Sequence, residues 1–209
     1  MTKNDLAARD LYRRHGAAWL IERANPRDTE ALFDLVRRYV GRGDTVLDVC
    51  CGYGRLLLPL LREGIDVFGV DISETLLDEA RDLLAAAGGF GHRIVAGNMK
   101  GLPVAGDRID VAFCVWASFN FLVSEDEQVQ ALRELHRVLK RGGTALIECP
   151  VHEDRAPVRT VDVDGVRYQY YALTIREMRR LTASSPFATS TVTTEAVAGR
   201  NRMIAVLRK

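Results

Sequence analysis

The sequence lacks the features that mark a disulfide scaffold, a zinc site or a membrane segment. Its 209 residues include only four cysteines, and none of them stands in the CxxC pair typical of zinc sites. It has no run of eighteen apolar residues, and its charged start, "MTKNDLAARD", does not resemble a signal peptide. We therefore expect a cytoplasmic protein whose cysteines are buried as small apolar side chains.

The sequence also lacks an excess of charge of one sign. Lysine and arginine number 29 against 28 aspartate and glutamate residues, which gives a formal net charge of +1, and the charges are scattered. A large nucleic-acid-binding surface requires a basic stripe, which this sequence does not have. We therefore expect a small-molecule substrate, neither nucleic acid nor a membrane as a partner, and a monomer or homodimer.

The chain instead contains a regular alternation of strands and helices. Five apolar strand candidates are separated by segments of helical period, and they lie at 45–49, 66–70, 93–96, 109–115 and 144–149. Apolar strands joined by helices predict a parallel sheet that is covered on both faces. Two helices, at 5–21 and 28–40, precede the first strand, and the capping sequences "SEDE" and "TIRE" predict helices that begin at Ser124 and Thr174.

The last third of the chain has a different pattern. Asp164-Gly165 separates two alternating segments and predicts a β-hairpin within 158–173. Two runs rich in β-branched residues, 189–197 and 202–207, are separated by too few residues for a parallel crossover. We therefore expect the sheet to end with an antiparallel pair of strands.

The stretch "VLDVCCGYGRL", at 46–56, is the candidate ligand loop. Its strand ends in Asp48, and Gly52 and Gly54 then allow a sharp turn beside a helix N-terminus. The next strand ends in Asp71, 17 residues beyond Gly54. This spacing is close to that at which an acidic side chain accepts hydrogen bonds from ribose hydroxyls. The loop therefore predicts a nucleoside-containing ligand.

A dinucleotide-dependent dehydrogenase is the rival interpretation. Cys50 and Leu57 stand where the GxGxxG fingerprint requires its first and last glycine. The antiparallel pair at the end of the chain is foreign to the ordinary doubly wound NAD domain, and the pattern predicts no second, substrate-binding domain. These three observations weigh against a dehydrogenase.

Several motifs in order resemble the class I S-adenosylmethionine-dependent methyltransferases, in the branch that acts largely on small molecules. The motifs are "VLDVCCGYGRLLLPLLREGIDVFGVDISETLLDEARD", "GNMKGLP", "IDVAFCVWASFNFLVSEDE" and "LHRVLKRGGTALIE". The resemblance implies an α/β, Rossmann-like, seven-stranded mixed sheet with a reversed last strand, helices on both faces and N-terminal lid helices. It also implies a single domain over 1–209, made of a lid segment (1–27), a cofactor-binding core (28–157), an inserted hairpin (158–173) and a closing helix with an antiparallel strand pair (174–209).

The same resemblance implies S-adenosylmethionine as the cofactor and S-adenosylhomocysteine as its product, with no metal ion. The residues that it places around the cofactor are Tyr12 on the lid, at the carboxylate; Asp48, Cys50, Gly52 and Gly54, at the methionine half; Asp71, at the ribose; Ile72, Asn98 and Met99, at the adenine; and Val115 and Trp116, at the sulfonium.

Two of these residues depart from the family pattern. Asn98 stands where aspartate is common, and since an amide oxygen still accepts a hydrogen bond, we expect a modestly altered affinity. Cys50 replaces the first glycine of the loop. Because cysteine is strained at positive φ, we expect an ordinary backbone conformation at Cys50.

The candidate catalytic residues are Tyr12, Asn120 and His152. His152 follows the fifth strand candidate and is a candidate general base or else a solvated loop residue, and Asn120 is a candidate to hydrogen-bond the acceptor. The motifs of the amide, cytosine-C5 and metal-dependent catechol methylases are absent. This pattern favours transfer of the methyl group to an O or N atom of a small metabolite by direct displacement. The alternative is a protein of the same fold that binds the cofactor but acts as a binding or regulatory module, or catalyses another reaction.

Overall fold

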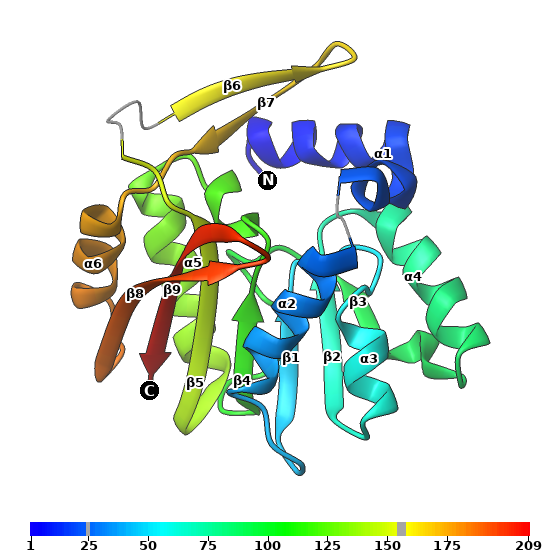
Figure 1. Cartoon of the computed structure of the whole chain (residues 1–209), viewed down its shortest axis with the longest axis horizontal. Coiled ribbons are helices and arrows are strands. Elements are labelled where there is room, and N and C mark those ends of the chain that lie inside the picture. The colour runs from blue at the N-terminus through cyan, green and yellow to red at the C-terminus, as the bar shows by residue number, and fades with distance from the viewer. Residues whose placement is uncertain (24–25, 154–157) are drawn as a thin grey trace.

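A mixed sheet of seven strands forms the centre of the molecule in the computed structural model, which describes residues 1–23, 26–153 and 158–209 (Figure 1). Its order is β3-β2-β1-β4-β5-β9-β8. The strands are β1 (Thr45–Val49), β2 (Asp66–Asp71), β3 (Ile94–Ala96), β4 (Ile109–Cys114), β5 (Leu139–Pro150), β8 (Thr189–Val197) and β9 (Arg200–Arg208). The first five strands are parallel, whereas β9 is antiparallel to both β5 and β8. The predicted fold, with its reversed last strand, is confirmed.

Helices cover both faces of this sheet because successive side chains of a buried strand point to opposite sides. Helices α2 (Pro26–Arg37), α3 (Leu57–Arg62) and α4 (Glu74–Ala86) share one apolar cluster with Val46, Val111 and Phe113. Helices α5 (Glu125–Val138) and α6 (Ile175–Ala183) share another with Leu47 and Ala112. Two short 3₁₀ turns are also present: η1 (Phe90–Arg93), which precedes β3, and η2 (Ser118–Phe121), which buries Phe119.

Side-chain caps fix the beginnings of three helices. The hydroxyls of Ser73, Ser124 and Thr174 each accept a hydrogen bond from the amide three residues later, at the starts of α4, α5 and α6. The Glu177 carboxylate in turn accepts from the Thr174 amide, which makes a reciprocal capping box. The helix starts predicted at Ser124 and Thr174 are confirmed.

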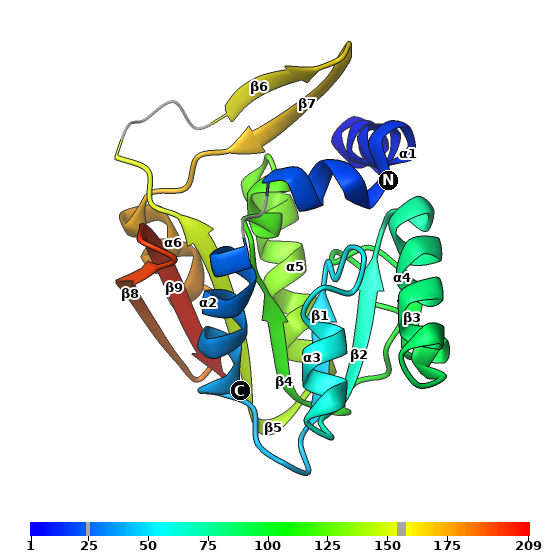
Figure 2. The same ribbon diagram turned by 45° about the vertical axis from the view of Figure 1, so that its right-hand side comes forward.

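Helix α1 (Lys3–Arg23) and the hairpin of β6 (Val158–Val163) and β7 (Val166–Tyr171) lie over the carboxyl edge of the sheet (Figure 2). The hairpin and the helix over 5–21 were predicted, but a kink within that helix was not. Gly16 adopts φ 60° and ψ −165° and kinks α1. The Glu79 carboxylate accepts the Ala17 amide at 3.0 and 3.1 Å and so caps the second half of the helix.

Within the parts of the chain that the structure describes, no helix is both long and apolar enough to cross a membrane.

Candidate active site

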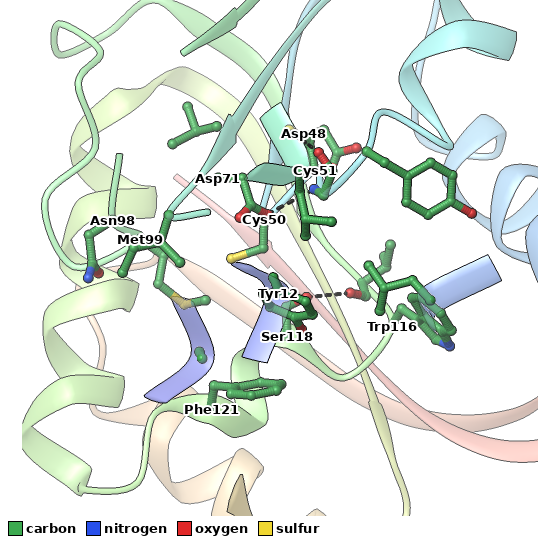
Figure 3. Close-up of a pocket in the computed structure, with 18 of the residues that line it drawn as sticks. Tyr12, Asp48, Cys50, Cys51, Asp71, Asn98, Met99, Trp116, Ser118 and Phe121 are labelled. Atoms are coloured by element: carbon green, nitrogen blue, oxygen red, sulfur yellow. Dashed lines mark hydrogen bonds between the residues drawn. The ribbon is translucent and has the colours of Figure 1, made fainter. Parts of the chain in front are cut away.

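A cavity of about 280 Å³ lies between the sheet and α1 (Figure 3). Its walls come from α1, from the segments that follow β1, β2, β3 and β4, and from β7. Strand order reverses between β1 and β4, since β2 and β3 lie on one side and β5 on the other. Open α/β sheets bind ligands in the crevice outside the carboxyl ends of the strands at such a point.

The turn after β1 supplies the first wall. The amides of Cys50 and Cys51 both donate to the carbonyl oxygen of Val70, at 2.7 and 3.0 Å. Two successive amides that reach one carbonyl require the chain to fold back, and Cys50 accordingly has φ 68°. The expectation of an ordinary conformation at Cys50 is therefore wrong. Gly52, with φ 55°, continues the turn, and Asp48 faces the cavity although only 3% of it is exposed.

Cys50 and Cys51 contribute to the packing of this turn, and their thiols are neutral. A Cβ at Gly69 would lie 2.7 Å from the Cys51 sulfur, so Cys51 fills the space that this glycine leaves on β2. A hydrogen bond with Cys114 and burial raise the pKa of the Cys50 thiol well above its usual value, and burial does the same for Cys51. Thiols are nucleophiles and metal ligands as thiolates, which this environment disfavours.

Asp71 ends β2 at the centre of the pocket, with 6% of the residue exposed. One carboxylate oxygen accepts the Gly52 amide at 2.8 Å and the other accepts the Ser73 amide at 2.9 Å. Burial raises the pKa of Asp71. Since each carboxylate oxygen has two lone pairs, both oxygens retain one with which to accept a hydrogen bond from a ligand hydroxyl. Ile72 also lines the cavity.

The segment after β3 forms the next wall. Asn98 and Met99 both line the cavity, on the side of Asp71 away from Trp116 (Figure 3). The Asn98 side-chain oxygen accepts the Lys100 amide at 2.9 Å, which fixes the orientation of the carboxamide. One lone pair of that oxygen and the carboxamide N–H groups remain for a ligand.

The segment after β4 has an unusual backbone. Val115 and Trp116 line the cavity, and Trp116 and Ala117 have φ 57° and 65°. The Trp116 amide donates to the Glu148 carboxylate at 2.5 Å. Glu148 is 0% exposed and forms an ion pair with Arg202 on β9. A buried ion pair thus holds the loop that carries Trp116.

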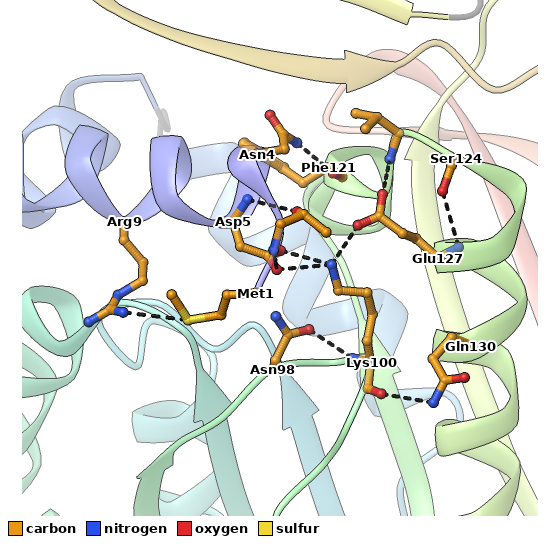
Figure 4. A network of polar contacts seen from close by, with 12 residues as sticks. Met1, Asn4, Asp5, Arg9, Asn98, Lys100, Phe121, Ser124, Glu127 and Gln130 are labelled. Atoms are coloured by element: carbon orange, nitrogen blue, oxygen red, sulfur yellow. Dashed lines mark hydrogen bonds and ion pairs between the residues drawn. The ribbon is translucent and has the colours of Figure 1, made fainter.

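Helix α1 closes the cavity, and polar contacts fasten its N-terminal end (Figure 4). The Asn4 side chain donates to the carbonyl oxygens of Phe121 and Gln169, at 2.7 and 2.9 Å. The Lys100 ammonium lies between the carboxylates of Asp5 and Glu127, at 3.0 and 2.6 Å. We call the ion pairs of Asp5, Lys100 and Glu127 the lid latch.

Tyr12 projects from α1 into the same cavity, where its ring centroid lies 6.2 Å from that of Trp19 (Figure 3). Burial, and then the charge of Asp71, raise the pKa of the Tyr12 phenol far above its usual value. The hydroxyl is therefore a neutral hydrogen-bond donor at neutral pH.

Three residues singled out in the sequence are not among those that line the cavity. Gly54 has φ 80° and packs its backbone against α4, where a Cβ would lie 3.5 Å from that of Ala80. Asn120 is 1% exposed and donates to the carbonyl oxygen of Tyr171 at 2.6 Å, which ties η2 to the hairpin. The ring of His152 lies 5.7 Å from that of Tyr170.

Six charged residues at or beside the cavity were not singled out in the sequence: Asp5, Arg23, Arg55, Lys100, Glu148 and Arg202. One signal was present, because Glu148 is the only charged residue of the strand candidate at 144–149. Over the described residues, no three His, Cys, Asp or Glu side chains are grouped so as to hold a metal ion.

The fold and the position of the pocket define a class of protein, the α/β proteins with the fold of known methyltransferases. The solved structure of the 1,6-didemethyltoxoflavin-N1-methyltransferase of Burkholderia thailandensis, with bound 1,6-didemethyltoxoflavin and S-adenosylhomocysteine, is similar with a TM-score of 0.74 and 21% identity. The similarity covers 98% of this chain and 88% of that one.

Residues 46–143 match the family described as "Methyltransferase domain". These comparisons confirm the resemblance of the chain to class I S-adenosylmethionine-dependent methyltransferases.

Two relatives are similar to this chain in sequence. The ubiquinone/menaquinone biosynthesis C-methyltransferase UbiE of Citrobacter koseri is 36% identical over 112 residues, which are 52% of this chain and 43% of that protein. The probable methyltransferase ltbC of Aspergillus luteorubrus is 27% identical over 161 residues, which are 73% of this chain and 56% of that protein. The matches thus span about half the length of these relatives.

Proposed function

We propose that the protein is an S-adenosylmethionine-dependent methyltransferase that transfers the methyl group to a small-molecule acceptor and releases S-adenosylhomocysteine. The observation that carries the proposal is the buried carboxylate of Asp71, which faces the cavity with one lone pair on each oxygen still available. A vicinal diol supplies the two donors that such a carboxylate accepts. The bound S-adenosylhomocysteine of the Burkholderia enzyme, whose fold is similar, supports the proposal.

Within this proposal each wall of the cavity has a role. Asp71 accepts the ribose diol, and Ile72, Asn98 and Met99 contact the adenine. The turn of Cys50, Gly52 and Gly54, together with Asp48, faces the methionine half, and Gly54 acts by shaping the turn. Val115 and Trp116 lie beside the sulfonium, and Tyr12 donates a hydrogen bond from the lid. The buried carboxyl groups of Asp48 and Asp71 favour a ligand with a cationic part.

The reaction that we propose is a direct displacement. A lone pair of the acceptor forms a bond to the methyl carbon as the carbon–sulfur bond breaks, and the sulfonium becomes a neutral thioether. Alignment of the three atoms can supply about 7–11 kcal/mol of the barrier reduction. No histidine lines the described part of the cavity. This favours an O or N nucleophile that already has a free lone pair, although the name of the Citrobacter relative specifies a carbon acceptor.

The test of the cofactor site is calorimetric titration with S-adenosylhomocysteine. Asp71→Asn keeps the size of the side chain but removes one acceptor oxygen and the charge, so we expect affinity to fall by about 10- to 150-fold. Asp66→Asn is the matched control, because Asp66 begins the same strand and is exposed outside the cavity. Equal affinity of the Asp71 variant and the control would refute the assignment.

Turnover is tested separately. The protein is incubated with a cell extract and S-adenosylmethionine that carries an isotope-labelled methyl group, and small molecules are analysed by mass spectrometry. We expect one labelled methyl group on an O or N atom for each S-adenosylhomocysteine formed. Tight binding without any labelled product would instead favour a binding or regulatory module.

We also propose a cytoplasmic location and a single domain over residues 1–209. The free state of all four cysteines supports a reducing compartment. The contacts of α1 and the hairpin with the core around one shared cavity support a single unit.

A further inference from the structure

The guanidinium of Arg55 lies in the wall of the pocket and has one buried nitrogen without a hydrogen-bond acceptor among the described residues. It lies over the ring of Trp116, with its central carbon 3.8 Å from the ring centroid, and both side chains line the cavity. Its Nη1 atom is buried, and within the described residues no acceptor hydrogen-bonds to it.

Other arginines of this chain show what such a group ordinarily does. Arg38 binds both carboxylate oxygens of Glu195, at 2.6 and 3.0 Å, and Arg180 binds both oxygens of Glu125, at 2.7 and 2.8 Å. A guanidinium presents its donors as a planar fork that matches a carboxylate. Arg55 has no such pair among the described residues, although it is less exposed than Arg38 and Arg180.

The surroundings of Arg55 favour an anion from outside the chain. Taking a guanidinium out of water without a counter-ion is unfavourable, and burial accordingly lowers the pKa of Arg55. Attraction by Tyr53 and by the carboxylates of Asp48, Asp28 and Glu148 offsets only part of that burial effect. Stacking on Trp116 fixes the plane of the guanidinium and leaves its N–H edge free to bind a ligand.

A second cation lines the same cavity. The guanidinium of Arg23 lies over the ring of Trp19, 3.9 Å from the centroid, and donates to the Trp19 carbonyl oxygen at 3.3 Å. The walls of the cavity therefore carry acidic groups at Asp48 and Asp71 and basic groups at Arg23 and Arg55. A ligand that is cationic in one part and anionic in another complements this distribution.

We propose that Arg55 is the carboxylate receptor of this pocket and binds both oxygens of a ligand carboxylate through its guanidinium edge. This inference rests on the proposed function for the source of the carboxylate. The ligand carboxylate belongs either to the amino-acid end of the cofactor, whose ammonium then faces Asp48, or to an acidic group on the methyl acceptor. The two sources share one chemistry, and separate titrations distinguish them.

The first titration compares two ligands on the wild-type protein. S-adenosylhomocysteine carries the carboxylate, and its decarboxylated analogue, 5′-(3-aminopropylthio)-5′-deoxyadenosine, does not. If the cofactor supplies the carboxylate, we expect S-adenosylhomocysteine to bind about 10- to 100-fold more tightly. Arg55→Gln should abolish that preference and Arg55→Lys should keep part of it. Arg62→Gln, an exposed position on α3 outside the cavity, should leave it unchanged.

The second titration uses protein saturated with S-adenosylhomocysteine. The probes are 4-hydroxybenzoate and its neutral counterpart 4-hydroxybenzamide. If the acceptor supplies the carboxylate, the benzoate should bind more tightly than the benzamide, and Arg55→Gln should remove the difference while leaving the affinity for S-adenosylhomocysteine within twofold. Circular dichroism confirms that each variant is folded, and the comparison of ligands on the wild type depends on no variant.

The proposal is overturned if neither ligand pair shows a preference on the wild type, or if the preferences survive Arg55→Gln in a folded protein. Failure of the proposed function gives a different result. The wild type then binds no S-adenosylhomocysteine at all. The affinities for the benzoate and the benzamide are in that case measured without S-adenosylhomocysteine, on the wild type and on Arg55→Gln. A preference for the benzoate that is lost in Arg55→Gln would still show that Arg55 binds carboxylates.

Discussion

Replacement of Arg202 by methionine tests whether a buried ion pair supports the wall of the pocket. Glu148 is 0% exposed, and its carboxylate accepts hydrogen bonds from the Arg202 side chain and the Trp116 amide. Methionine has a long apolar side chain that replaces the arginine stem but carries no charge. The Arg202→Met variant therefore leaves a buried carboxylate with the Trp116 amide as its remaining partner among these contacts.

The expected loss of stability is large. Removal of one partner from a buried ion pair costs about 3–5 kcal/mol. In a domain of 150–250 residues, 1 kcal/mol shifts Tm by about 2–4 °C, so we expect Tm to fall by about 6–20 °C. Glu148→Gln in the same chain removes the unpaired charge and keeps an oxygen that accepts the Trp116 amide. The double variant should therefore recover most of the loss.

The assay is thermal unfolding of the wild type, Arg202→Met and the double variant at pH 7.5. Arg208→Met is the control, because Arg208 is an exposed arginine on the same strand, β9. Affinity for S-adenosylhomocysteine, measured well below Tm, reports on the Trp116 loop. A loss below about 1 kcal/mol, or a double variant as unstable as Arg202→Met alone, would contradict our account of the ion pair.

Two further predictions concern the pocket and its lid. Burial, and then the charge of Asp71, raise the pKa of Asp48 well above the unfolded value of 3.8. The stability that the protonated carboxyl contributes is complete below pH 3.8 and is lost as pH rises through the folded pKa, so Asp48→Asn should raise Tm more at pH 8 than at pH 4.5. An equal shift at both pH values would contradict this. Lys100→Gln breaks the lid latch and should speed hydrogen exchange in the first half of α1, whereas Lys140→Gln, which breaks the Asp110 pair at the other end of the sheet, should not. Unchanged exchange in α1 would show that the latch does not hold the lid.

The sheet could be predicted from the sequence because its strands are buried on both faces. Such strands appear as continuous apolar runs, and β1, β2 and β4 begin and end within a residue or two of those runs. The start of β5 was not predictable in this way, since Lys140, Arg141 and Gly142 extend the strand with polar residues and a register shift against β4. The kink at Gly16 was also missed, because the Glu79 carboxylate that caps it belongs to another helix.

The candidate site was predictable where a local motif carries it. Asp48, Asp71, Asn98 and Trp116 each follow a strand, and parallel strands bring their carboxyl ends to one edge of the sheet. The contacts of Glu148 with Trp116 and Arg202 join residues 32 and 54 positions apart, and no periodicity indicates such pairs. The conformation of Cys50 was unpredictable for the same reason, since its cause is the carbonyl group of Val70 on the next strand.

Three of the six non-glycine residues with positive φ in the described part of the chain lie at the edge of the pocket. Cys50 after β1 and Trp116 and Ala117 after β4 all have positive φ, and such conformations cost about 1–3 kcal/mol each for residues other than glycine. Hydrogen bonds to the Val70 carbonyl and the Glu148 carboxylate offset part of this cost. Glycine at position 50 would adopt the same turn without strain, but it would lack the side chain that packs against the apolar cluster containing Cys114. Cysteine at this position therefore adds core packing to the turn after β1. This turn and the turn after β4 flank the point at which the sheet reverses its strand order and the cavity opens.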